Sequence, residues 1–298
     1  MVNSYCVCHF LYKGECELEF IVLSENHSNG SMQGEHGLSF AVSFSGYKFL
    51  FDTGNSDLFK INAQKLGFSV DYFENIVFSH GHSDHTNGIL HIGKRKRIIA
   101  HPEIFRDRYS IRQKCYCGFP VEKDEMKTVH NVYTTQRPVE INPNIWFLGE
   151  IPMVVDFEKN GNFATTLDGA FKQIDLTEDD SAVVFDTTKG LVIMVGCSHR
   201  GICNVIEYAK KVTGKTQIYA VIGGLHLRNL ENKKEQINKT IEYFRANSVR
   251  NLYLGHCTSD DVINYIEEKL PTTKMFRLAV GKKFNVEKRT ETDLVNKN

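Results

Sequence analysis

The stretch FSHGHSDHTNG, residues 78–88, places three histidines and an aspartate close together, at His80, His82, Asp84 and His85. Imidazole and carboxylate groups in one cluster suit Zn²⁺, Fe²⁺ or Mn²⁺ better than Ca²⁺. The spacing H-x-H-x-D-H lets the first two histidines bind one ion while the aspartate and the third histidine bind a second. The alternative is a polar loop of solvated histidines. Because the ordered set follows a strand-like run, the sequence favours a metal site.

Three further histidines follow strand-like runs in the same way. His199 comes after the apolar run at 190–195, and His256 comes after the run at 250–255. Loops on a rigid scaffold carry chemistry, so we expect both side chains to face the same cleft as further ligands. His226, in GGLHL, is expected to line the site as a substrate contact or an acid/base group rather than as a ligand.

The elements that position these residues are visible in the apolar pattern. Short runs rich in β-branched and aromatic residues, bounded by Gly, Asn or Ser, predict strands, and apolar residues at helical spacing predict helices. The strands are predicted at 39–44, 47–52, 75–79, 97–100, 144–149, 181–186, 190–195, 217–223 and 250–255, and the helices at 201–211, 232–246 and 259–270. Two sheets with helices outside them, an α+β fold, account for this order.

The chain has 298 residues and 41% apolar content, enough to bury a substantial core. We expect a single domain over residues 1–285 and a charged C-terminal tail over 286–298. The segment 152–180 is polar and irregular, and loops of that length tend to be lids or substrate walls.

Charge and hydropathy exclude several classes of partner. Lys+Arg and Asp+Glu both number 36, so no basic excess indicates a nucleic acid or an anionic membrane. No apolar run approaches the roughly 18 residues of a membrane-spanning helix, and the N-terminal residues do not resemble a secretory signal. We expect a cytoplasmic protein with a small-molecule substrate. The oligomeric state does not follow from the sequence.

The eight cysteines are neither dense nor spaced like a disulfide framework, so they are expected to be mostly free thiols. Two CxC pairs, Cys6/Cys8 and Cys115/Cys117, could chelate a metal. Neither has a second pair at zinc-site spacing, and surface or half-buried thiols are the alternative.

A family resemblance extends across roughly residues 35–260. The segments that carry it are EHGLSFAVSFSGYKFLFDTGNSDLFKINAQKLGF, FSHGHSDHTNGIL, AHPEIF, DDSAVVFDTTKGLVIMVGCSHRGICN, IGGLHL and GHCTS, in that order. Together they resemble the metallo-β-lactamase superfamily, and within it the branch of metal-dependent hydrolases and dihydropteridine-linked ribofuranosylaminobenzene 5′-phosphate synthases, a methanopterin-type reaction. The resemblance implies an αββα sandwich with metals at one edge.

The same resemblance implies a role for Asp52, in LFDTG, as the residue that accepts a hydrogen bond and thereby orients a ligand histidine. A helix N-cap or turn residue is the alternative. Most superfamily members also place a bridging aspartate after a strand-ending glycine, whereas here Gly196 is followed by Cys197. Either Cys197 or His199 substitutes, or the second metal is held more weakly. A buried Cys197 behind the ligands is the simpler interpretation.

Arg200 stands beside His199, at the predicted start of a helix. If its guanidinium reaches the cleft, it forms an anion site with the free N–H groups of the helix N-terminus, suited to a substrate phosphate or carboxylate. A solvated arginine is the alternative.

Three classes of function remain open. The first is a metal-dependent hydrolase that directs an activated water at a small ester, lactone or phosphodiester, with Asp84 both binding metal and orienting that water. The second is a metal-dependent synthase or transferase acting on pterin and pentose-phosphate substrates, which only the resemblance supports. The third is a non-catalytic metal-binding sensor. The expected cofactor is one or two divalent transition metal ions, zinc in the first place and iron or manganese as alternatives.

Overall fold

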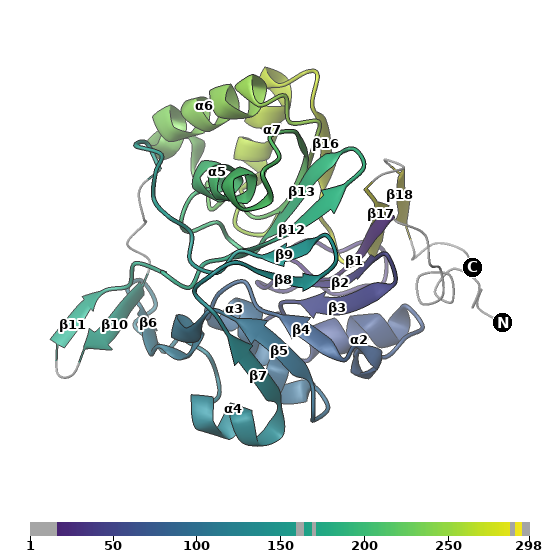
Figure 1. Ribbon diagram of the computed structural model, residues 1–298, viewed down its shortest axis with the longest axis vertical. Coiled ribbons are helices and arrows are strands. Elements are labelled where there is room, and N and C mark those ends of the chain that lie inside the picture. Colours follow the sequence, from purple (N-terminus) through teal and green to yellow (C-terminus); the bar gives the residue numbers. More distant parts are fainter. Residues whose placement is uncertain (1–16, 159–163, 169–170, 287–289, 294–298) are drawn as a thin grey trace.

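The computed structural model describes residues 17–158, 164–168, 171–286 and 290–293, so Cys6 and Cys8 lie outside the described residues. Two large sheets pack face to face with helices on their outer faces (Figure 1). The expected αββα sandwich is confirmed. Among the described residues, every helix is too short or too polar to cross a lipid bilayer.

The first sheet is mixed, and its strands across the sheet are β18 (Thr290–Asp293), β17 (Lys282–Asn285), β1 (Leu18–Ser24), β2 (Ser39–Phe44), β3 (Tyr47–Phe51), β4 (Asn75–Val77), β5 (Arg97–Ala100) and β7 (Asn131–Thr134). The second sheet contains β16 (Lys274–Arg277), β15 (Asn251–Leu254), β14 (Ile218–Gly223), β13 (Gly190–Val195), β12 (Ala182–Thr187), β9 (Ile145–Phe147) and β8 (Val139–Asn142). A small third sheet contains β11 (Phe171–Ile174), β10 (Ala164–Asp168) and β6 (Arg108–Ser110).

The helices form two outer layers (Figure 1). Helices α5 (Ile202–Thr213), α6 (Leu230–Ala246) and α7 (Asp260–Lys269) cover the second sheet. The first sheet carries α2 (Leu58–Lys65) and α4 (Lys123–Val129), and the short α3 (Ser83–Thr86) lies at its edge. Single turns of 3₁₀ helix are found at Val70–Tyr72, Asn87–His91 and Pro102–Phe105.

The core between the two sheets is rich in aromatic side chains. Phe20, Phe40 and Phe49 of the first sheet pack in one buried cluster with Phe185 and Tyr253 of the second. Burying one such side chain contributes about 1.5–3 kcal/mol, and the cluster therefore fixes the two sheets relative to each other. This rigid contact sets the distance between loops that leave different sheets.

Every predicted strand and helix is present, with ends displaced by no more than two residues. The structure differs from expectation in the segment 152–180, which is not a simple loop: β10 and β11 pair with each other, and β10 also pairs with β6. Thr290–Asp293, inside the expected tail, forms β18 against β17. Both segments are polar. Their strands form through backbone hydrogen bonds and lack the apolar pattern from which a strand is predicted.

Candidate metal centre

The carboxyl ends of parallel strands bring the predicted residues to one edge of the sandwich. In the first sheet β3 runs parallel to β4, and in the second β13, β14 and β15 run parallel to one another. Because side chains that follow parallel strands emerge at the same edge, the loops after these strands converge. Those loops carry Asp52, the 80–85 cluster, the 197–200 segment, His226 and His256.

One set of potential ligands consists of His80, His82 and His199. All three side chains are buried, and one ring nitrogen from each lies within 4.8 Å of the others. His82 Nδ1 and His199 Nε2 are 3.1 Å apart. Residues separated by more than a hundred positions thus meet as a three-nitrogen group.

A second set consists of Asp84, His85 and His256. The Oδ2 atom of Asp84 lies 3.7 Å from His85 Nε2 and 3.4 Å from His256 Nε2, and these two nitrogens are 3.1 Å apart. His36, on the exposed side, also approaches Asp84 Oδ2, at 3.3 Å. This second set has the mixed imidazole and carboxylate character expected from the sequence.

Cys197 lies where the two sets meet. Its Sγ atom is 3.3 Å from His85 Nε2, and Cys197, His80 and His85 together form a further group of donor atoms within 4.8 Å. Cys257 is buried nearby and shares a group with Cys197 and His256. By contrast, Cys115 is exposed, Cys117 is half-buried, and neither joins a group of potential ligands within the described residues.

The donor atoms fit transition-metal ions. Two nitrogens bound to one tetrahedral zinc ion are about 3.3–3.4 Å apart, close to the two 3.1 Å separations observed. His80 Nε2 is buried and has no hydrogen-bond partner among the residues that the structure describes. An unsatisfied buried polar atom is costly, and metal ligation would satisfy it.

The electrostatics also suit a bound cation. Desolvation lowers the pKa of His80 and His199 well below the ordinary value, and that of His82 and His256 to about 4. These four imidazoles are therefore neutral at pH 7, which is the form that binds metals. Burial opposes a charge on His85 as well, but Asp84 and Asp52 raise its pKa to about 9. A positive charge is thus favoured between these two carboxylates.

Asp52 supports the cluster from behind. It is fully buried; Oδ1 accepts the backbone N–H of Ser79 at 2.8 Å, and Oδ2 accepts the hydroxyl of Ser79 at 2.7 Å. Oδ2 also lies 2.8 Å from His85 Nδ1. Asp52 thus keeps a proton on Nδ1 and directs Nε2 of His85 at the second set, where a bound metal ion would take the place of the second proton that the cationic ring carries.

Replacing Asp52 by Asn is expected to lower turnover by about 10–100-fold, the usual effect of losing a residue that orients a metal ligand. The amide has one acceptor oxygen in place of two, so it cannot accept both the backbone N–H of Ser79 at Oδ1 and the hydrogen bonds now made to Oδ2, and His85 loses its fixed orientation. Turnover and metal content should be measured on the same preparation. Unchanged turnover would mean that Asp52 does not orient His85.

Close packing requires glycine at two positions in the site. A Cβ atom on Gly81, between His80 and His82, would lie 2.2 Å from the carbonyl oxygen of Ile104. A Cβ atom on Gly196 would lie 2.1 Å from the hydroxyl oxygen of Ser79, where the end of β13 meets the end of β4. No Cβ atom can lie so close to another heavy atom. The backbone can therefore pass this close to its neighbours at positions 81 and 196 only because both residues are glycine.

A buried ion triad lies behind the histidine loop. Arg108 donates from Nε to Asp175 Oδ2 at 2.7 Å and from Nη2 to Asp179 Oδ1 at 2.6 Å, and all three side chains are buried. The other carboxylate oxygen of Asp179 accepts the backbone N–H of Gly81 at 2.7 Å. The triad therefore holds the loop from which His80 and His82 project.

Several loop residues have left-handed backbone conformations. The φ angles are +56° at Asp52, +53° at Ser198, +50° at His226 and +53° at His256. Such angles are uncommon for residues other than glycine and are found at functional sites. Each of these residues follows the end of a strand at the cluster edge, and the turn directs the chain across the site.

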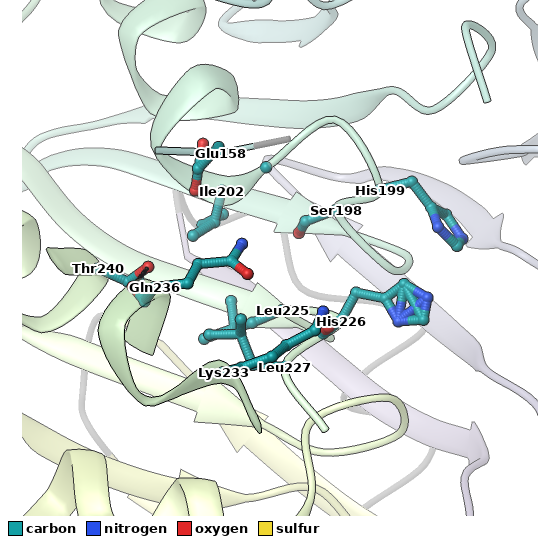
Figure 2. Close-up of a pocket in the computed structure, with 11 residues that line it drawn as sticks. Glu158, Ser198, His199, Ile202, Leu225, His226, Leu227, Lys233, Gln236 and Thr240 are labelled. Atoms are coloured by element: carbon teal, nitrogen blue, oxygen red, sulfur yellow. Dashed lines mark hydrogen bonds between the residues drawn. The ribbon is translucent and has the colours of Figure 1, made fainter. Parts of the chain in front are cut away.

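His226 and His199 lie side by side, with ring centroids 4.4 Å apart, and they project in the same direction from neighbouring loops (Figure 2). Desolvation, followed by the charges of Lys233 and Arg228, lowers the pKa of His226 well below the ordinary value. A cavity of about 20 Å³ lies behind the two histidines. It has room for about one water molecule, so a substrate does not enter from that side.

Arg200 is buried rather than solvated. Its Nε donates to the carbonyl oxygen of Ile151 at 3.0 Å, and its backbone N–H donates to Asp180 at 3.0 Å. The N-terminus of α5 is also already occupied, because Glu158 accepts the backbone N–H groups of Cys203 and Asn204. An anion site built from Arg200 and free helix N–H groups would have to displace Glu158, and its substrate role stays a prediction.

The structure also shows residues that sequence reasoning missed. Arg108, Asp175 and Asp179 were not assigned, although the two aspartates lie in the acidic run DLTEDD. His36 precedes Gly37 in the first resemblance segment, and its ring stacks on that of His256 with centroids 5.2 Å apart. The signal available for His36 was its position next to a glycine of that segment. No local pattern indicated that Arg108, Asp175 and Asp179 are buried.

Comparison with known proteins adds independent findings. A model of the metallo-beta-lactamase superfamily matches residues 33–208. The chain is 30% identical over 270 residues to the Methanocaldococcus jannaschii protein named 7,8-dihydropterin-6-methyl-4-(beta-D-ribofuranosyl)-aminobenzene-5′-phosphate synthase, covering 85% of this chain and 91% of that protein.

Solved structures are similar as well. The crystal structure of Tm1679, described as a metal-dependent hydrolase of the beta-lactamase superfamily, has a TM-score of 0.79 and 29% identity, covering 90% of this chain and 98% of Tm1679. The structure of Zn²⁺-bound PqqB from Methylobacterium extorquens has a TM-score of 0.52 and 12% identity, covering 89% of this chain and 99% of PqqB. The second likeness shows the fold alone.

Proposed function

Because the chain belongs to the metallo-β-lactamase superfamily, we propose that it is a metal-dependent hydrolase of a small ester, lactone or phosphodiester. The observation that carries this proposal is the pair of adjoining donor sets at one sheet edge: His80, His82 and His199 beside Asp84, His85 and His256. The hydrolase Tm1679, to which the chain is similar over most of its length, supports the same class.

The donor sets would hold one or two divalent transition metal ions, with zinc favoured by the imidazole-rich ligands and by the thiol of Cys197 at their junction. Such ions supply an acidified water and a Lewis acid that polarises the attacked group. The negative charge of Asp84 would hold and orient that water on the exposed side of the site, where its side chain is 20% exposed. Asp52 would keep His85 in place throughout the reaction.

His226 would serve as the base or hydrogen-bond acceptor toward the substrate. Its lowered pKa keeps the ring neutral at pH 7, so it can accept a proton but does not start as a cation. The backbone around it is held by two contacts: its N–H donates to Cys257 Sγ, and its carbonyl accepts from Lys233 Nζ at 3.1 Å. These contacts fix the ring next to His199.

Elemental analysis of the purified protein is expected to find between one and two equivalents of transition metal per chain, because imidazole-rich sites retain such ions. Removal of the metal with a chelator should abolish hydrolysis of generic phosphodiester and lactone substrates, and added Zn²⁺, Fe²⁺ or Mn²⁺ should restore it. A metal-free preparation with full activity would contradict the proposal.

A second candidate is a synthase acting on pterin and pentose-phosphate substrates, which the 30% identity to the Methanocaldococcus jannaschii synthase favours. The same donor sets would then hold and polarise the substrates. Incubation of the metal-loaded protein with pterin and pentose-phosphate pairs, followed by mass analysis, separates the two: a joined product indicates a synthase, and hydrolysis of the generic substrates indicates a hydrolase. Metal binding without turnover of either kind would indicate a sensor.

A further inference from the structure

A hollow of about 310 Å³ opens beside the second donor set. The residues that line it include His256 and His36, which lie at the metal centre, together with Arg228 and Asp260. Its volume lies at the lower end of the range for small-molecule sites, far above that of the cavity behind His199 and His226. A small molecule in this hollow would lie against His256 and His36, and His36 Nε2 is 3.3 Å from Asp84 Oδ2.

Arg228 is a cationic side chain of this hollow that is available to bind a ligand. The residue is exposed, it lies in the loop between β14 and α6, and within the described part of the chain its guanidinium has no hydrogen bond or ion pair. The acidic residue of the hollow, Asp260, is already balanced, because it lies 3.2 Å from Arg277 Nη1 and 3.5 Å from His27 Nε2. The free charge on this wall is therefore positive.

The electrostatic surroundings agree with this placement. Desolvation is the main reason why the pKa of His36 is lowered; Asp84 counteracts it, and the charge of Arg228 adds to the lowering. Desolvation and then Lys233 and Arg228 act in the same direction on His226. The geometric link is that Arg228, His36 and His256 line the same hollow.

We propose that Arg228 binds the anionic group of the substrate, a phosphate or a carboxylate, in the hollow beside His256. The inference rests on the proposed function and names its substrate class: a small molecule with an anionic group next to the bond that is attacked. A guanidinium offers paired N–H donors that match the oxygens of phosphate or carboxylate, and such charge-assisted pairs are stronger than neutral ones.

The test uses the metal-loaded full-length protein and two probes, inorganic phosphate and acetate, whose dissociation constants are measured by calorimetry. Arg228→Ala is expected to weaken binding of the preferred anion about 10–100-fold, as for loss of one charged hydrogen-bonding partner, and Arg228→Lys should weaken it less. Arg250→Ala is the matched control, since Arg250 is exposed at the opposite end of β15 from His256. A larger effect on phosphate identifies a phosphate ester, and a larger effect on acetate identifies a carboxylate.

Kinetics distinguish failure of this inference from failure of the proposed function. Two substrates of the same reaction are compared, one anionic and one neutral. Arg228→Ala should raise KM for the anionic substrate by the factor by which it weakens anion binding, and it should leave KM for the neutral substrate unchanged. Metal content should stay at the wild-type level. Equal anion binding in Arg228→Ala, Arg250→Ala and wild type would overturn the inference while turnover persists. Absence of any turnover by the metal-loaded wild type would overturn the proposed function instead.

Discussion

Replacing Asp84 by Asn is expected to lower turnover by roughly 10²-fold or more, while the protein stays folded and keeps about one metal ion per chain. Asparagine retains the size of the side chain and one oxygen, but it removes the charge that lies 3.3–3.7 Å from His36, His85 and His256. Burial by itself would raise the pKa of Asp84, but His85 foremost, and then His256 and His82, hold it well below the ordinary value, so the group acts as a carboxylate. The variant therefore loses affinity for the second ion and the orientation of the attacking water.

Metal content and turnover of the Asp84→Asn variant should be measured beside those of Asp52→Asn. The first donor set, His80, His82 and His199, contains neither aspartate, so one ion should remain in both proteins. The opposite result would be two ions and wild-type turnover in Asp84→Asn, with both lost in Asp52→Asn. It would mean that Asp52 is the direct ligand and Asp84 the orienting residue.

Replacing Arg108 by Ala is expected to destabilise the protein by about 3–5 kcal/mol, the usual cost of removing one partner from a buried ion pair. The variant leaves Asp175 and Asp179 buried without their cation. It should also reduce metal content, because Asp179 holds the backbone of Gly81 between two ligands. Denaturant unfolding, compared at equal metal loading, measures the stability change.

Arg106→Ala is the matched control, two positions along the chain. Its guanidinium pairs with Glu103 and Glu178 near the surface, where an ion pair contributes about 0–1 kcal/mol. Equal destabilisation by the two variants would show that the buried triad has no special role in holding the histidine loop.

The strand-end histidines could be predicted because their positions depend on local patterns. An apolar run followed by His199 or His256 indicates both the strand and the place where the side chain emerges, and parallel strands bring such places together. The strands of the two large sheets could be predicted for the same reason, because a strand that is covered on both faces has apolar residues on both of them. The candidate ligands and the sheet edge that they share could therefore be predicted from short-range patterns, while their role as ligands stays a prediction.

The triad could not be predicted because its members meet only in the folded chain. Arg108 is 67 residues from Asp175 and 71 residues from Asp179. In the sequence, each is an ordinary charged residue in a polar segment, and such residues are mostly exposed. The pairing of β6 with β10, and of β10 with β11, leads the chain back to Arg108, and these strands have no apolar pattern that would reveal it.

At Asp52, His226 and His256, the left-handed backbone makes the candidate site costly for the stability of the fold. Each non-glycine residue in this conformation costs about 1–2 kcal/mol that glycine would not, so the edge that carries the chemistry is strained. Glycine at Asp52, His226 or His256 would relieve the backbone and at the same time remove a candidate orienting carboxylate, substrate contact or metal ligand. Selection for stability alone would therefore replace the residues of the site first and leave the fold unchanged. In a descendant that no longer needs the reaction, glycines at these three turns would therefore indicate lost activity, even where the fold had become more stable than in its ancestor.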